Sequence, residues 1–468
     1  MTENSITIDE QDIELFNSVF SKENLENTFK NKKSIYSKQS SGIDRKSIEN
    51  FEKETKNIFP KILEKIKGSD YYFSPYVESL FLRGPDKQPR RISLPTIRDK
   101  LTLDLVRQYL NKKLGQSVKR TLPNIYIKEI KKFFEDKDTK SLKYKRIDIS
   151  SFYKSINHII LLNFLRNIKV HDSVYTLIRR AIKTNTYNKS VYLRKDKENN
   201  NKGLPEGLSI SNVLAEYYLR EIGLIPIPQG VLYQRYVDDI LILYQDEHAF
   251  QSFYNKIERK FKKLDLNISK DEDKTGEGNL SSDKGFNFLG YDFKKGKIYA
   301  KRRSQVKLIN TIIKLFTQYK YSTQKNELKN RILIEDVNEK LTGAMSESIK
   351  YGWIFFFREI TDINFLYQVD ILVEKLLDRY KLSVSSEVKK IKQISKAYYK
   401  LKKNDYSYCH NYDAYSTFSD KINYLSGRVK ESREDLKTKT FEYIDSLFKE
   451  VRNRNLSNLE KDNGVESY

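Results

Sequence analysis

The chain has 468 residues, of which 87 are Lys or Arg and 63 are Asp or Glu, so its formal charge is +24. This length allows two or three domains with a sizeable core, and the basic excess indicates a polyanionic partner, either nucleic acid or an anionic membrane face. One Cys and four His exclude a disulfide framework and a zinc cluster. A polar N-terminus and the lack of an apolar run of membrane-spanning length predict a cytoplasmic protein that does not bind membranes.

Residues 1–40 are polar with weak helical periodicity, so we expect an extension or a docking arm there. Apolar side chains near helical spacing then predict an amphipathic helix, and an aromatic and an arginine-rich stretch predict two strands before a further helix. These elements are a helix over 48–66, strands over 71–82 and 90–99 around a charged turn at 83–87, and a helix over 101–114.

The middle of the chain alternates strands and helices. Their predicted order is a strand over 144–149, a helix over 158–168, a charged loop over 194–202, a turn at 203–212 that opens a helix over 213–222, a helix over 248–264 and a strand over 286–293. From residue 301 the β-type signals stop, so the rest of the chain is predicted to be helical, with Trp353 in a buried helix.

An apolar run at 231–233 and a β-rich run at 240–244 flank two adjacent carboxylates, Asp238 and Asp239. Two β-type runs joined by so few residues predict a hairpin with the acids near its tip. Side chains alternate across a strand, so one acid can face a metal while the other lies beside it. A solvated turn is the alternative, because Asp is common in turns.

Asp148 ends another predicted strand, and strand ends hold carboxylates rigidly. Magnesium is usually held by one or two carboxylates together with water and substrate phosphates. Two such ions about 3.5–4 Å apart clamp the attacking and leaving oxygens of an in-line phosphoryl displacement. In a chain this basic, carboxylates at two strand ends predict a nucleotidyl transfer centre.

Four sequence blocks follow one another in order: Asp148–Tyr153, Gly203–Asn212, Tyr236–Asp239 and Phe288–Gly290. They resemble the DIxxFF, GxPQGxxxSP, YxDD and FLG blocks of bacterial reverse transcriptases, as in group II introns, retrons and abortive-infection systems. The resemblance spans residues 41–295. It implies an α+β right-hand polymerase with an N-terminal extension (1–40), fingers (41–145), a palm with an antiparallel sheet (146–300) and an α-helical thumb and C-terminal extension (301–468).

The resemblance also implies the catalytic groups. Asp148, Asp238 and Asp239 would be the catalytic residues and would hold two Mg²⁺ ions, for which Mn²⁺ can substitute. The Ile149 carbonyl would lie near the metal, and Asp239 would support the charge and geometry of the site. Tyr153 would pack under the sugar and reject a 2′-hydroxyl, so the product would be DNA; ordinary packing in the palm is the alternative for this ring.

The remaining contacts carried over by resemblance concern the nucleotide and the template. Arg90 and Lys87 would hold the triphosphate, since a guanidinium suits bidentate phosphate contact, with Arg91 and Arg98 as competitors. Ser211 and Lys270 would also contact the nucleotide. Template and primer would be contacted by residues of the second and fourth blocks, namely Gly203, Pro205, Glu206, Gly207, Phe288, Leu289 and Gly290.

The sequence departs from the family pattern in two places. Glu206 stands where the family has Gln, which places an acid close to the nucleotide and the template. The lysine expected after Leu264-Asp-Leu-Asn267, a candidate general acid for pyrophosphate, is either Lys270 or Lys274. Nearby acids leave this assignment open.

Residues 301–468 carry no zinc-binding or endonuclease pattern, so an intron-homing enzyme is not expected. Leu341–Gly343 with Tyr351–Trp353 is similar to the thumb and extension of abortive-infection and other antiphage reverse transcriptases. Tyrosines and lysines alternate over 398–415, a mixture that can bind single-stranded nucleic acid or form half-buried helix faces.

We therefore expect a reverse transcriptase in antiphage defence that uses an RNA template, dNTPs and Mg²⁺ to make DNA. Its partner would be a noncoding RNA, a second polymerase or accessory subunit, or a further copy of the chain. One alternative is template-independent, protein-templated or protein-primed DNA synthesis, with Ser467 or Tyr468 among the candidate priming hydroxyls. Another is a nucleic-acid-binding scaffold with an inactive palm.

Overall fold

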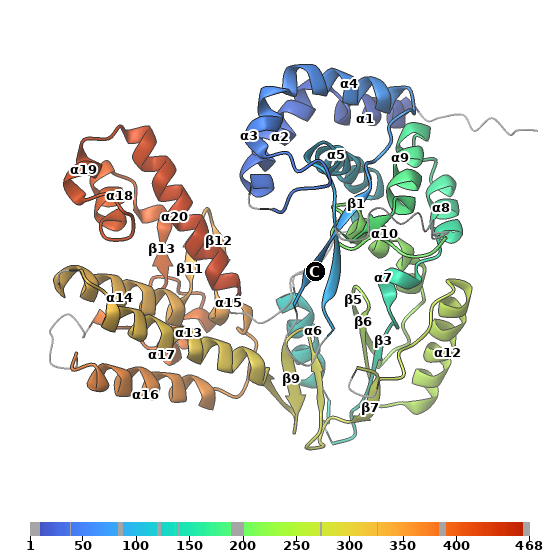
Figure 1. The fold of residues 1–468 in the computed structure, drawn as a ribbon. Helices are drawn as coiled ribbons and strands as arrows, with labels where there is room; N and C mark the ends of the chain where they lie inside the picture. The colour runs from blue at the N-terminus through green and yellow to red at the C-terminus, as the bar shows by residue number, and fades with distance from the viewer. Residues whose placement is uncertain are drawn as a thin grey trace, which may run out of the picture. The chain divides into compact units, whose positions relative to one another are not determined.

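The computed structural model describes residues 10–37, 39–82, 88–118, 123–135, 137–138, 140–188, 201–271, 274–324, 326–382 and 390–461 (Figure 1). The chain divides into two compact units. Unit 1 comprises Met1–Arg120 and Lys145–Gly276, and unit 2 comprises Thr121–Tyr144 and Glu277–Tyr468. Helices and mainly antiparallel sheets occur in both units, so the predicted α+β class is confirmed.

Unit 1 contains most of the predicted site. Its elements are α1 (Glu10–Val19), α2 (Lys22–Ser37), α3 (Ile48–Lys53), α4 (Thr55–Lys67), β1 (Tyr76–Phe81), β2 (Arg90–Leu94), α5 (Ile97–Leu114), η1 (Gly115–Val118), β3 (Lys143–Asp148), α7 (Phe152–Ser155), α8 (His158–Asn167), α9 (Asp172–Lys183), β4 (Thr186–Tyr187), α10 (Ser211–Tyr218), α11 (Arg220–Gly223), β5 (Leu232–Tyr236), β6 (Asp239–Tyr244) and α12 (Glu247–Lys263).

Helix α5 lies at the centre of unit 1 and contacts α1, α2, α9 and α10. The hydroxyl of Thr96 caps its first turn by accepting a hydrogen bond from Asp99 N. Side chains on all sides of the helix are buried, including Leu101, Leu103 and Val106. A helix buried all round belongs to a core, and here it is the support onto which the rest of the unit packs.

The first 40 residues are part of this core from residue 10 onward. The buried Asp12 on α1 accepts a hydrogen bond of 2.5 Å from the Tyr109 hydroxyl and lies 2.9 Å from Lys113 Nζ. On α2, the Tyr36 hydroxyl donates to Asp104 Oδ2 at 2.6 Å. Both partners of each pair are buried or nearly so, so the two N-terminal helices are anchored on α5 by polar as well as apolar contacts.

Two sheets complete unit 1. In the first, β1 pairs antiparallel with β2 and parallel with the short β4. In the second, β5 and β6 form an antiparallel hairpin with Tyr236 opposite Asp239, and β3 is the next neighbour of β6 (Figure 1). The hairpin predicted from residues 231–244 is therefore confirmed, and the strand that ends at Asp148 lies beside it.

Unit 2 is largely helical. Its elements are α6 (Pro123–Glu135), β7 (Gly276–Asn279, which begins in unit 1), β8 (Phe286–Phe288), β9 (Tyr291–Lys294), β10 (Lys297–Ala300), α13 (Arg302–Tyr321), α14 (Asn326–Thr342), β11 (Ala344–Ser346), β12 (Ile349–Tyr351), α15 (Trp353–Phe356), α16 (Asn364–Arg379), α17 (Ile394–Lys402), β13 (His410–Asn411), η3 (Tyr412–Ala414), α18 (Phe418–Leu425), α19 (Arg433–Lys437) and α20 (Phe441–Lys461).

Two expectations for this unit are wrong. The single strand predicted over 286–293 is two antiparallel strands, β8 and β9, because Leu289 and Gly290 both have positive φ and turn the chain. The prediction that β-structure ends at residue 301 fails as well, since β11, β12 and β13 form a small sheet. Trp353 is buried at the start of α15, as predicted.

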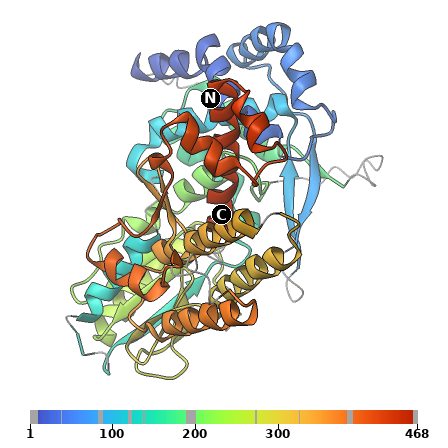
Figure 2. The same cartoon turned by 90° about the vertical axis from the view of Figure 1, so that its left-hand side faces the viewer.

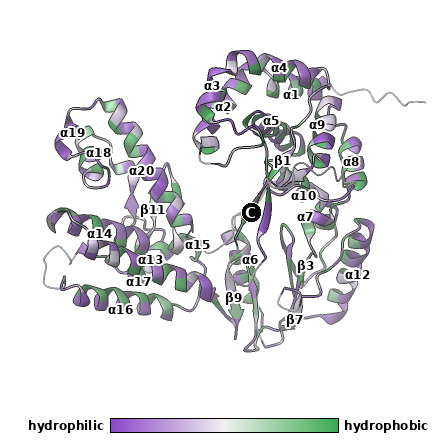
Figure 3. Cartoon of the chain, in the orientation of Figure 1, coloured by the Kyte–Doolittle hydropathy of each residue, from purple (hydrophilic) through white to green (hydrophobic). Residues whose placement is uncertain are grey.

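The helices of unit 2 are amphipathic and cover their own apolar centre. Figure 2 shows α13, α14 and α16 from the side, and Figure 3 shows hydrophilic and hydrophobic positions alternating along them. On α16, for example, Leu366, Val369 and Val373 are buried at helical spacing. No helix in the described ranges is both long enough and apolar enough to cross a membrane.

Candidate active site

The loop of the β5–β6 hairpin consists of two residues, Val237 and Asp238. Val237 is buried with φ +57°, a conformation that is uncommon for a β-branched residue and that places the first loop residue in the left-handed region. Arg235 holds this loop, because its Nη1 donates to the Val237 carbonyl at 3.2 Å while its Nη2 pairs with Glu216 on α10. Backbone strain of this kind is found where the surrounding structure fixes a functional residue.

Asp148, at the end of β3, is fixed by the segment that follows α12. Its backbone N–H donates to Thr275 Oγ1 at 3.2 Å, and its carbonyl accepts from Ser269 N at 2.8 Å. Ile149 is buried and forms a β-bridge with Ile268. The backbones that carry the two acids are therefore held by separate sets of contacts, Asp148 by the segment after α12 and the hairpin loop by Arg235.

Asp148 and Asp238 are close enough to repel each other. The pKa of Asp238 is raised to about 6, chiefly by burial and next by the charge of Asp148, with Asp239 adding to the rise and Arg90 opposing it. The pKa of Asp148 is also raised, by burial first, while Lys274 and Arg146 act in the opposite direction. Two carboxylates that resist ionisation together form a site that a cation would stabilise.

Asp239, unlike Asp238, forms an ion pair with an arginine. Its Oδ1 accepts a hydrogen bond of 3.1 Å from Arg146 Nε, and both side chains are largely buried. Arg146 precedes Asp148 by two residues on β3, so both side chains lie on the same face of that strand. Arg146 thus connects β3 to the hairpin and neutralises one of its acids, a contact that sequence reasoning missed, since the spacing of two residues indicates only that Arg146 and Asp148 share a face.

The residues present fit a divalent cation. In the part of the chain that the structure describes, no three His, Cys, Asp or Glu side chains are grouped as a ready-made ion site. Magnesium needs only one or two protein carboxylates, because water and phosphate oxygens fill its other positions. Asp148 and Asp238 supply two such oxygen donors, and their mutual repulsion would be relieved by a cation between them.

Arg90 is the predicted phosphate ligand that the structure brings to these acids. Its charge lowers the pKa of Asp238, and its Nε forms an ion pair with Glu206. The two competitors are committed elsewhere: Arg91 pairs with Glu78 on β1, and Arg98 pairs with Asp99. Lys87, the second predicted phosphate ligand, lies outside the described residues, as do Ser467 and Tyr468.

The predicted sugar-contacting Tyr153 is buried on α7, and its hydroxyl donates to Asn212 Oδ1 at 2.7 Å. Ser211 is also buried, and its hydroxyl donates to the Pro205 carbonyl at 2.7 Å. The first and second sequence blocks are therefore joined through side chains. In this structure the Ser211 hydroxyl closes the turn before α10.

The glycines of the second block allow close packing within the protein itself. Gly203 has φ +93°, and a Cβ there would lie 3.2 Å from the Lys154 carbonyl oxygen. Gly207 has φ +102°, and a Cβ there would lie 2.6 Å from Ile92 Cγ2 on β2. Side chains at these positions would be strained and would push the loop away from α7 and β2, so glycine here has a structural cause independent of any template.

Of the two candidate lysines, Lys274 is the one with a contact to a catalytic acid. Its Nζ lies 3.7 Å from Asp148 Oδ2, and its side chain is 55% exposed. Lys270 is exposed, and no contact of it with the acids is resolved. The fourth block, Phe288–Gly290, belongs to unit 2, where Phe288 ends β8 and the other two residues form the turn to β9.

The raised pKa of Asp238 leads to a prediction for the metal-free protein. The folded state holds this proton up to about pH 6, whereas the unfolded chain loses it near 3.8, so the contribution of Asp238 to stability is present below pH 3.8 and is lost as the pH rises through 6. Asp238→Asn should therefore raise the free energy of unfolding at pH 7.5 by about 1–3 kcal/mol and by about half as much at pH 5. Thermal melts in EDTA at both pH values test this; an equal effect at both would contradict it.

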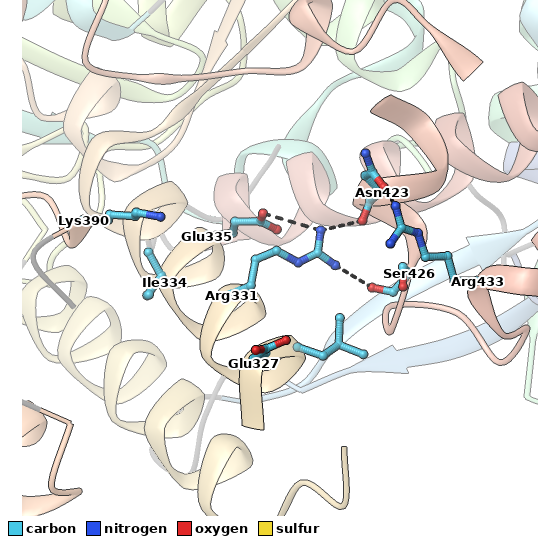
Figure 4. A pocket seen from close by; sticks show the side chains of 9 residues that line it. Glu327, Arg331, Ile334, Glu335, Lys390, Asn423, Ser426 and Arg433 are labelled. Atoms are coloured by element: carbon cyan, nitrogen blue, oxygen red, sulfur yellow. Dashed lines mark hydrogen bonds and ion pairs between the residues drawn. The ribbon is translucent and has the colours of Figure 1, made fainter. Parts of the chain in front are cut away.

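Unit 2 has a cavity of its own, of about 650 Å³. Figure 4 shows Arg331 at its centre, donating to the carbonyls of Asn423 at 2.5 Å and Ser426 at 2.9 Å, with Glu335 beside it. Lys390 and Arg433 also line it. None of the residues predicted from the sequence as site residues lines this cavity, and Arg331 holds α14 to the C-terminal end of α18.

Residues 82–293 match the family described as "Reverse transcriptase (RNA-dependent DNA polymerase)". The match begins before β2 and ends in β9, so it includes all four sequence blocks. This segment is therefore similar to the domain of RNA-directed DNA polymerases, which are nucleotidyltransferases. No curated protein matches the chain in sequence.

Solved structures of yeast telomerases resemble the chain remotely. Apo telomerase from Candida tropicalis has a TM-score of 0.42 and 14% identity over 83% of this chain and 66% of its own. Telomerase from Candida albicans in complex with a fragment of telomeric RNA has a TM-score of 0.41 and 13% identity over 89% of this chain and 68% of its own. A truncated apo form from Candida tropicalis has a TM-score of 0.37 and 16% identity. The match covers 56% of this chain and 63% of that structure. Structural similarity with TM-scores of 0.37–0.42 and 13–16% identity gives no information about function.

Proposed function

Since residues 82–293 match the reverse transcriptase family, we propose that the protein is an RNA-directed DNA polymerase that works by two-metal nucleotidyl transfer. The observation that carries this is that Asp148, at the end of β3, and Asp238, in the β5–β6 loop, lie close enough for the charge of Asp148 to raise the pKa of Asp238. Paired carboxylates with perturbed pKa values are typical of sites built to bind cations or to move protons. No Ser- or His-based nucleophile accompanies them among the predicted site residues.

Asp148 and Asp238 would hold the two Mg²⁺ ions, with the Ile149 carbonyl nearby, and Mn²⁺ could take the same donors. When bound, such ions lower the pKa of the attacking hydroxyl and neutralise the leaving pyrophosphate. Asp239 would act through Arg146, by fixing the hairpin against β3 and setting the charge beside the ions. Asp239 would thus support the site and leave the direct metal contacts to the other two acids.

Arg90, with Lys87, would bind the triphosphate of the incoming nucleotide. Tyr153 would lie under its sugar, and the hydrogen bond from its hydroxyl to Asn212 would keep the ring in place. Ser211 would act on the nucleotide through the turn it closes. Lys274, which lies beside Asp148, is a better candidate than Lys270 for the acid that protonates pyrophosphate.

Template and primer would be bound by the loop of Gly203, Pro205, Glu206 and Gly207, and by Phe288, Leu289 and Gly290. The net charge of +24 would favour binding of a nucleic-acid duplex through the phosphate backbones of both strands. The biological role we propose is antiphage defence in the cytoplasm, with a noncoding RNA or a second subunit as partner, on the ground of the resemblance of the sequence blocks to abortive-infection enzymes.

Synthesis on a defined RNA tests this proposal. Purified protein with Mg²⁺, labelled dNTPs and a primed RNA of arbitrary sequence should produce DNA complementary to that RNA, and ribonucleotides should not substitute. The sequence of the product decides among the alternatives. DNA that ignores the added RNA would favour template-independent or protein-templated synthesis, for which Glu206 in place of Gln is the motivating observation. RNA binding without incorporation under Mg²⁺ or Mn²⁺ would favour a scaffold.

A further inference from the structure

Glu206 and Arg90 form an ion pair between the loop before α10 and strand β2. Arg90 Nε contacts Glu206 Oε2, and the two side chains are 23% and 19% exposed. The backbone of the same loop is bound to the same strand, because Ser93 N donates to the Glu206 carbonyl at 2.7 Å. The pair is therefore anchored at its base and partly shielded from water, where charges interact more strongly than on an open surface.

The guanidinium of Arg90 interacts with acids on two sides. Besides its contact with Glu206, its charge lowers the pKa of Asp238 at the tip of the hairpin. The related sequence block has Gln where this chain has Glu206, and the two side chains are nearly the same size. This chain thus adds one negative charge, without adding bulk, beside the cation that faces the catalytic carboxylates.

We propose that Glu206 sets the nucleotide affinity of the site by neutralising Arg90 while it orients the guanidinium. The proposal rests on the function given above, in which Arg90 binds the triphosphate. A contact through Nε fixes the plane of the guanidinium, and the carboxylate cancels its charge. An incoming triphosphate therefore meets a pair of zero net charge in place of a free cation, and it binds more weakly than it would to an oriented but uncompensated arginine.

Replacement by glutamine separates the two roles. Glu206→Gln keeps an oxygen that can accept from Arg90 Nε and removes the charge. We expect the Kd of a non-hydrolysable deoxynucleotide, 2′-deoxyadenosine 5′-(α,β-imido)triphosphate with Mg²⁺, to fall by about two- to tenfold relative to the unaltered protein. In an Arg90→Gln background the same substitution should bring no gain, because the effect acts through that arginine.

Glu78→Gln is the matched control. Glu78 pairs with Arg91, the neighbour of Arg90 on β2, so its replacement changes the net charge of the protein by the same amount and frees an arginine on the same strand. If the gain came from overall charge, both variants would bind the nucleotide more tightly. The proposal requires the gain for Glu206→Gln alone.

Measurements of nucleotide binding and of DNA synthesis test the inference and the proposed function separately. If the unaltered protein makes no DNA but Glu206→Gln binds the analogue more tightly, the proposed function is wrong and this inference stands. If the protein makes DNA and the Kd of Glu206→Gln is equal to or higher than that of the unaltered protein, this inference is wrong and the function stands. Should the Gln variant be unfolded by circular dichroism, Glu206→Asn, which also removes the charge and keeps an amide oxygen, must show the gain. Absence of analogue binding in every variant overturns the inference.

Discussion

Asp238→Asn should reduce incorporation of dNTPs by about a thousandfold or more, because it removes a charged oxygen from the proposed ion site while keeping the size of the side chain. The loss should appear in kcat with every template and with either Mg²⁺ or Mn²⁺. The measurement is single-turnover primer extension at saturating dNTP. Since the metal-free variant is expected to be at least as stable as the unaltered protein at pH 7.5, a loss of activity cannot be assigned to unfolding.

Asp283→Asn provides the comparison. The Asp283 side chain is 83% exposed and pairs with Lys295, and neither residue has a role in the proposed reaction. Its replacement should leave incorporation unchanged. Activity of Asp238→Asn within tenfold of that of the Asp283 variant would mean that the hairpin acid is not a metal ligand.

Arg428→Met should lower the stability of unit 2 by about 2–4 kcal/mol, because it removes one partner of a buried charge network. The Arg428 side chain is only 7% exposed, and it donates to Asp336 Oδ1 at 2.6 Å and to Glu335 Oε2 at 2.9 Å. Its replacement removes the cation bound to Asp336 and leaves Glu335 with Arg331, whose Nη1 is 4.0 Å away. One turn further along, the buried Glu339 already has its pKa raised to about 7, chiefly by burial, and it accepts a hydrogen bond of 2.6 Å from the Tyr412 hydroxyl.

Thermal denaturation followed by circular dichroism measures this effect, with Arg433→Met as the control. Arg433 is exposed and makes one bond of 2.7 Å to the amide oxygen of Asn423, so its loss should cost under about 1 kcal/mol. Equal destabilisation by the two variants would mean that the network around Arg428 adds nothing beyond ordinary surface contacts.

The parts of the fold that could be predicted from sequence are those encoded locally. Two β-type runs joined by few residues are enough to predict the β5–β6 hairpin, and the apolar spacing of α12 is enough to predict a helix there. The acids at strand ends are likewise visible in the sequence. Strands β11, β12 and β13 were not predictable in this way, because two or three residues cannot display a period of two.

Contacts between residues far apart in the sequence could not be predicted from the sequence. Arg90 and Glu206 are 116 positions apart, and nothing in either segment indicates that one side chain neutralises the other. The pairing of Asp239 with Arg146 spans 93 positions, although the spacing of Arg146 and Asp148 gives a partial signal. Periodicity shows which face of an element is buried, but it does not show which partner covers that face.

The anchoring of α1 on α5 bears on how the protein can be shortened. A form that begins after residue 21 would lose Asp12, the partner of the Tyr109 hydroxyl and the Lys113 ammonium, and would expose to water the apolar surface that Phe16 and Phe20 cover. Helix α1 thus covers part of the hydrophobic core. A protein expressed without it would be poorly soluble and prone to aggregate.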